Sequence, residues 1–183
     1  MVNNSAQIKP LLLFAYGNLS RGDDALGPLL LANLEAQDAG FLQNVDFLTD
    51  FQLQIEHALD LENRALVLFV DASMSAQQGF SFQEIFPEKD QSYTTHAMSP
   101  AAVLSVYQQI KQHLPPPCFL LSIHGAAFEL GAALTTLAEQ HLAQATDFTK
   151  ILLHSPNLTE WREHEKNQRC LQQAHDSLTL TRG

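Results

Sequence analysis

Two adjacent aspartates, Asp23 and Asp24, follow a glycine-containing loop, and a third, Asp71, directly follows a run of apolar residues. A histidine, His96, precedes a predicted helix. Carboxylate oxygens and an imidazole nitrogen suit a borderline divalent metal such as nickel or zinc, with positions left for water or substrate. Taken singly, each residue has an ordinary explanation, because aspartates cap helices and lone histidines are mostly surface or hydrogen-bonding residues. The set therefore gains meaning only if the fold brings its members together.

The elements that would position these residues begin with short apolar runs. Runs without alternation, bounded by turn residues, are typical of strands buried on both faces, as in a parallel sheet. A shorter run is a plausible fourth strand, and an alternating one is typical of an edge strand. The predicted strands are Leu11–Tyr16, Val45–Leu48, Leu66–Val70, Phe80–Phe86 and Cys118–Ile123.

Helical patterns lie between these runs. Apolar residues recur at helical spacing from Leu26 to Leu34, a short helix is predicted over Gln54–Leu61, and Ser99 with Pro100 resembles a capped helix start. A last core helix is predicted from about Leu134 to Leu153. This alternation predicts a three-layer α/β/α sandwich with a mostly parallel central sheet of about five strands.

The chain divides by composition near Pro156. Residues 1–155 form the predicted single α/β domain, whereas residues 156–183 are polar and predict a tail or a peripheral helix. Acidic and basic residues are equal in number in this last segment, so the net charge of −10 belongs to the residues before it.

Ligands of open α/β sheets bind beyond the carboxyl ends of the parallel strands. That rule selects the loop Gly17–Gly27, Asp71 and the pair His124-Gly125, and the loop Gln91–Met98, with His96, could reach the same edge. Nucleotide binding fits poorly, because the chain has no GxGxxG motif, no P-loop lysine, and acids where a phosphate would lie.

Three residues of the first loop are expected to support the site. Gly17 and Asn18 close the first strand, and Asp23 either caps the following helix or orients Asp24. The sequence alone leaves both roles of Asp23 open.

Composition excludes several classes of protein. A net charge of −10 over 183 residues argues against binding to nucleic acids and to anionic membranes. The two cysteines, Cys118 and Cys170, have no metal-binding spacing, and no apolar run reaches the roughly 18 residues of a membrane span. The N-terminus lacks a signal-peptide pattern, so we expect a soluble cytoplasmic protein.

The motifs resemble those of the hydrogenase maturation endopeptidases. The resemblance covers roughly Leu11 to Ser155. It rests on GNLSRGDDALG at Gly17–Gly27, on VDA at Val70–Ala72, and on His96, which precedes the predicted helix that begins with SPAAVL. Two further phrases, FQLQIEHALDL and HGAAFELG, are similar to the branch that serves cytoplasmic NAD-linked bidirectional hydrogenases.

The resemblance implies an endopeptidase that removes a C-terminal extension from the large-subunit precursor of a NiFe hydrogenase once nickel has been inserted. The family's nickel-contacting positions fall on Asp24, Asp71 and His96, and the nickel is carried by the precursor. This chain departs from the family in having Ala25 where a glycine is commoner. It also has His124-Gly125 where many relatives have a glycine–proline-type turn, which bears on loop shape and substrate choice.

Two questions stay open at the level of sequence. Water could be activated beside a metal-polarised carbonyl by a carboxylate base, or by an aspartic-protease-like pair of carboxylates. The protein could also be a nickel-dependent checkpoint or chaperone that binds the precursor without cutting it. A small-molecule hydrolase is a third alternative, although the chain lacks a GxSxG nucleophile motif.

Overall fold

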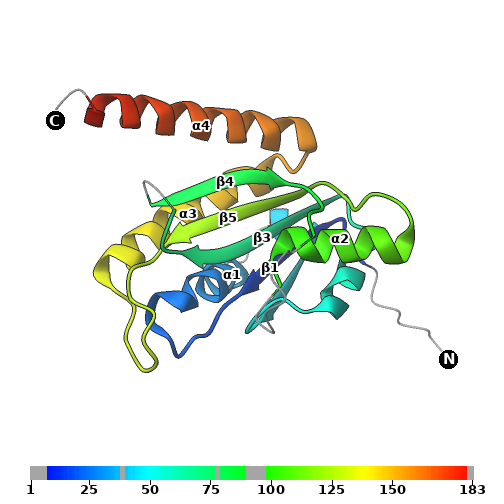
Figure 1. Cartoon of the computed structure of the whole chain (residues 1–183), viewed down its shortest axis with the longest axis horizontal. Helices are drawn as coiled ribbons and strands as arrows, with labels where there is room; N and C mark the ends of the chain where they lie inside the picture. Colours follow the sequence, from blue (N-terminus) through cyan, green and yellow to red (C-terminus); the bar gives the residue numbers. More distant parts are fainter. Residues whose placement is uncertain (1–7, 38–39, 77–78, 90–97, 181–183) are drawn as a thin grey trace.

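The computed structural model describes residues 8–37, 40–76, 79–89 and 98–180. Within these residues, five strands form one sheet in the order β2-β1-β3-β5-β4 (Figure 1). The first four in that order are mutually parallel, and β4 runs antiparallel to β5 at the edge. The predicted strands and the predicted α/β sandwich are thereby confirmed. The bounds are β1 Leu11–Tyr16, β2 Val45–Asp50, β3 Leu66–Ser73, β4 Phe80–Ile85 and β5 Cys118–His124.

Helices cover both faces of the sheet and form the outer layers (Figure 1). On one face lie α1, Leu26–Glu35, and α3, Thr136–His154. On the other lie α2, Pro100–Lys111, and the 3-10 helix η3, Ile55–Leu61. Two further 3-10 helices, η1 Gly22–Ala25 and η2 Gly40–Asn44, precede α1 and β2.

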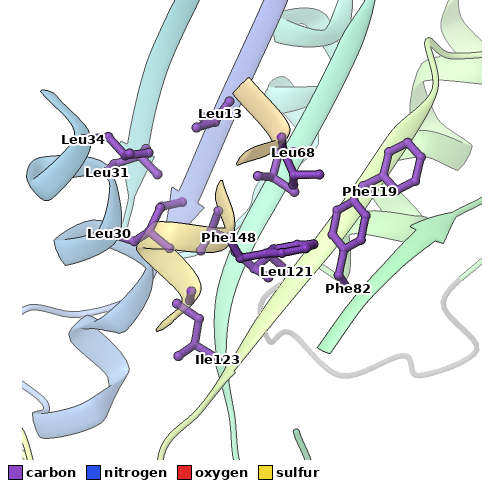
Figure 2. Close-up of a cluster of buried hydrophobic side chains, with 14 of the residues drawn as sticks. Leu13, Leu30, Leu31, Leu34, Leu68, Phe82, Phe119, Leu121, Ile123 and Phe148 are labelled. Atoms are coloured by element: carbon purple, nitrogen blue, oxygen red, sulfur yellow. The ribbon is translucent and has the colours of Figure 1, made fainter. Parts of the chain in front are cut away.

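The inner strands are apolar throughout because both of their faces are buried. Successive side chains of a strand point to opposite faces, so Leu13 packs under α1 whereas Phe14 packs under η3 and α2. Figure 2 shows the first of these cores, where Leu30 and Leu34 of α1 gather with Phe148 of α3 over the sheet. This two-sided burial explains why the strands were predictable as unbroken apolar runs.

Side-chain caps set the starts of two helices. The Ser99 hydroxyl accepts a hydrogen bond from Ala102 N (3.2 Å) at the start of α2, as its position before Pro100 predicts. Thr135 Oγ1 accepts one from Ala138 N (3.1 Å), so α3 begins at Thr136, slightly later than its apolar pattern suggests.

The polar segment after Pro156 contains a long helix, α4, Leu158–Leu180, which lies beside β4 (Figure 1). Its first turns are held by Trp161, which is fully buried and donates from Nε1 to Leu152 O (3.0 Å). The indole ring meets Phe119 edge-on at a centroid distance of 5.2 Å, and the Arg162 guanidinium forms a two-pronged ion pair with Glu84. The segment is thus a peripheral helix anchored in the core.

None of the helices among the described residues combines the length and the apolar character that crossing a membrane requires.

Candidate active site

The first loop returns Asp24 to the end of β1. The chain leaves β1 at Tyr16, and the Asp24 carboxylate accepts a hydrogen bond from Asn18 N (3.0 Å). Gly17 makes this return possible, because its φ of +142° is unfavourable for other residues and a Cβ there would lie 2.1 Å from Asp24 O. Asp24 is half-buried and lies at the carboxyl edge of the sheet.

Asp71 lies near the carboxyl end of β3, between β1 and β5. Burial raises the pKa of Asp71 to about 7. A hydrogen bond from the Tyr16 hydroxyl and one from Ala72 N–H oppose that rise, and the charge of Asp24 adds to it. An acid with a pKa near neutrality is suited to accept and donate protons during hydrolysis.

Asp24 and Asp71 therefore lie close enough for their charges to interact. Two carboxylates that share a site are costly when both are ionised, and either a proton or a cation removes that cost. Neighbouring carboxylates of this kind are suited to contact a cation presented by a partner or to exchange a proton.

Asp23 lies in the protein interior, where its side chain is fully buried. Its carboxylate accepts four hydrogen bonds: from Ala126 N (2.8 Å), Ala127 N (3.1 Å), Thr135 N (2.8 Å) and Thr135 Oγ1 (3.0 Å). Burial alone would raise the pKa of Asp23, but these donors outweigh it and leave the pKa below its ordinary value. Asp23 therefore joins two loops rather than capping α1, whose start has no side-chain cap.

The two joined loops follow β1 and β5 and lie at the same end of the sheet (Figure 1). They approach so closely that a Cβ at Gly125 would lie 2.7 Å from the Asp23 Cβ. Gly131 N also donates to Ser20 O (2.7 Å). The position of Asp24 is consequently set by segments more than a hundred residues away in the chain.

His96, the third predicted metal-contacting residue, lies outside the described residues, as does most of its loop. Among the residues that the structure does describe, no group of three or more histidine, cysteine or acidic side chains could hold a metal ion. Of the predicted set, the structure places Asp24 and Asp71 at the carboxyl edge of the sheet, within range of each other's charge, and their role in metal contact stays a prediction.

His124, at the end of β5, contacts two other segments of the chain. Its Nδ1 lies 2.6 Å from Ala76 O, and its ring meets that of His141 edge-on at 5.4 Å. These contacts tie the end of β5 to the segment after β3 and to α3.

Two residues of the site were missed by sequence reasoning. Tyr16 was interpreted only as the last apolar residue of β1, although it donates its hydroxyl to Asp71. Thr135 falls inside the predicted helix, which starts at about Leu134, so the sequence pattern does not identify it as the N-cap of α3. Its other role, as a donor to Asp23, depends on the tertiary structure.

No family model matches the sequence, and neither does any curated protein. Solved structures do match. The NiFe hydrogenase maturation protease HycI from Thermococcus kodakarensis KOD1 has a TM-score of 0.60 and 18% identity, over 82% of this chain and 96% of that chain. The chain has the fold of the hydrogenase maturation proteases.

Two Escherichia coli proteins support this assignment of the fold. The hydrogenase maturating endopeptidase HybD has a TM-score of 0.59 and 22% identity, over 79% of this chain and 93% of that chain. An endopeptidase solved in solution has a TM-score of 0.62 and 21% identity, over the same shares. The maturation-protease fold is therefore shared at low sequence identity, and it is the fold that the motifs imply. The narrower resemblance to the NAD-linked branch stays a prediction.

Proposed function

We propose that the protein is an endopeptidase that removes the C-terminal extension from the nickel-loaded large-subunit precursor of a NiFe hydrogenase. The observation that carries the proposal is that Asp24 and the half-buried Asp71 lie within range of each other's charge at the carboxyl edge of a maturation-protease fold. Ligand sites of open α/β sheets lie at this edge, so the carboxylates are where a substrate would bind.

The proposal assigns nickel to the substrate. Asp24 and Asp71 would complete the coordination of nickel carried by the precursor, and His96, outside the described residues, would supply the third contact. Oxygen and imidazole ligands suit Ni(II), and a cation would also relieve the repulsion between the two carboxylates. Nickel would thereby act as the recognition element, because an empty precursor would lack these contacts.

Hydrolysis then requires a base for the attacking water and an acid for the leaving nitrogen. The water oxygen bonds to the peptide carbonyl carbon while one of the two carboxylates takes its proton. The carbon–nitrogen bond breaks, and the nitrogen receives a proton from the same carboxyl group. The products are a new C-terminal carboxylate on the large subunit and a released peptide.

Intact-mass spectrometry tests the proposal. The purified protein is mixed with large-subunit precursor from the same organism, in nickel-loaded and nickel-free forms. We expect the nickel-loaded precursor alone to lose the mass of its C-terminal extension, and Asp24→Asn to abolish that loss. A nickel-loaded precursor that stays intact would contradict the proposal and favour the checkpoint alternative.

A further inference from the structure

Large apolar side chains are exposed on four loops at the carboxyl edge of the sheet. Among the described residues, Leu19 is 63% exposed, Phe51 71%, Met74 71% and Leu130 77%. They follow β1, β2, β3 and β5 respectively, so each lies at the end of a parallel strand. Exposed apolar side chains that gather around one site are typical of a binding surface.

The first pair borders a hollow of about 500 Å³ between the ends of β1 and β2. Leu19 and Phe51 line it, together with Pro28 from α1. The two loops are joined by a hydrogen bond from Gly17 N to Asp50 O (3.1 Å). Asp50 is further held by His57, with 3.2 Å between Nε2 and Oδ2. The floor of this hollow is therefore well supported.

The second pair borders a hollow of about 740 Å³ near the ends of β3 and β5. Met74 and Leu130 line it, together with Arg21 and Phe128. Arg21 Nε donates to Phe128 O (3.2 Å), which joins the first loop to the loop after β5.

In the strand order of the sheet, the candidate active site lies between the two hollows. Strand β3, with Asp71, lies between β1 and β5 in the sheet. The loop after β1 lines both hollows, through Leu19 and through Arg21, and it also carries Asp24. A chain that fills both hollows would therefore cross the loop after β1, which carries Asp24, close to the end of β3, which carries Asp71.

The charged residues near the two hollows limit the kind of peptide segment that could bind there. In the described parts of these loops and the ends of their strands, Arg21 is the one lysine or arginine, whereas Asp24, Asp50, Asp71 and Glu129 are acidic. Asp23 is also acidic, but its charge is compensated by internal hydrogen bonds. An acidic segment would be repelled, so the surface fits an apolar segment that is neutral or basic.

From the position, apolarity and charge of this surface, we propose that the two hollows dock the C-terminal segment of the precursor. The segment binds as an extended peptide without acidic residues, and it places one apolar side chain in each hollow, on either side of the cleaved bond. This inference rests on the proposed function and names the residues that would select its substrate.

Steady-state cleavage of the nickel-loaded precursor by four variants tests the inference. Phe51→Ser and Leu130→Ser each remove an apolar contact from one hollow. Ile110→Ser and Ile151→Ser are matched controls, because these residues are 54% and 53% exposed on α2 and α3. We expect each hollow variant to raise KM roughly tenfold with kcat nearly unchanged, since a uniform binding contact is lost. The controls should match the wild type, and thermal melts should be alike for all four.

The possible outcomes separate this inference from the proposed function. If the wild type cuts the precursor and both hollow variants keep its KM, the docking surface is wrong and the endopeptidase stands. If the wild type does not cut, sedimentation velocity compares precursor binding among the same variants. Weaker binding in the hollow variants would then support the docking surface alone, and equal binding would overturn it. If the hollow variants change only self-association of this chain, a second copy is the occupant and the inference is wrong.

Discussion

Asp23 and Asp24 are neighbours in sequence but have opposite surroundings. Asp23 is fully buried and accepts four hydrogen bonds, whereas Asp24 lies half-buried at the edge beside Asp71. The first residue therefore contributes to stability and the second to the proposed chemistry. Substitution by asparagine, which keeps the size and removes the charge, should separate the two roles.

Asp23→Asn should lower the free energy of unfolding at pH 7 by about 1–3 kcal/mol, because the amide nitrogen cannot accept the hydrogen bonds that a carboxylate oxygen accepts. The folded-state pKa of Asp23 lies below its unfolded value, so its contribution is present above the unfolded pKa and is lost as pH falls through the folded one. The difference in unfolding free energy between the wild type and the variant, measured by urea unfolding, should therefore become smaller below about pH 4. If this difference in unfolding free energy does not change with pH, the negative charge of Asp23 does not contribute to stability.

Asp71→Asn should have the opposite effect on stability. The folded-state pKa of about 7 lies above the unfolded value, so ionised Asp71 destabilises the fold as pH rises from about 4 to above 7. The variant should gain about 1–2 kcal/mol of unfolding free energy at pH 8, allowing for partial solvent screening, and little at pH 4. It should also lose cleavage. Urea unfolding at both pH values checks this, and a variant less stable than the wild type at pH 8 would contradict it.

At the scale of elements, α4 shows how a polar segment is held on an apolar core. Most of the helix is polar, but Trp161 in its first turn enters the cluster formed by Phe82 and Phe119. The indole N–H is satisfied by Leu152 O, so the large side chain is buried without an unpaired donor.

Trp161→Ala should therefore cost about 3–5 kcal/mol of unfolding free energy, the usual range for a large aromatic removed from a core. Leu171→Ala, on the same helix but 60% exposed, is the matched control and should change stability little. Chemical denaturation of both variants measures the difference. Equal stabilities would mean that α4 does not contribute to the cooperative core.

At the scale of the whole molecule, the net charge of −10 lies outside the last segment, and Asp24 and Asp71 of the candidate site are among its acids. Such a field attracts basic partners, repels acidic ones and leaves neutral ones largely unaffected, over distances that salt shortens. The charge thus agrees with the kind of substrate segment that the edge of the sheet would accept.

For a precursor whose C-terminal segment is basic, raising the ionic strength from about 0.05 M to 0.5 M should therefore lower kcat/KM for cleavage severalfold, because screening reduces the attraction between that segment and the acidic protein during encounter. Stopped-flow or quenched time courses at low precursor concentration measure this value. An unchanged or higher kcat/KM in salt would indicate that apolar contacts alone govern association.

The amino-acid sequence by itself determined the strands, most helix starts and the edge of the sheet at which Asp24 and Asp71 lie. These features follow from local patterns, because burial on two faces requires apolar runs and parallel strands end at a common edge. Only the tertiary structure decided that Asp23 binds the loop after β5, that Tyr16 donates to Asp71, and that Trp161 belongs to the core. Each of these contacts joins segments far apart in the chain, and both the donors around a carboxylate and its burial depend on which distant segments pack against it.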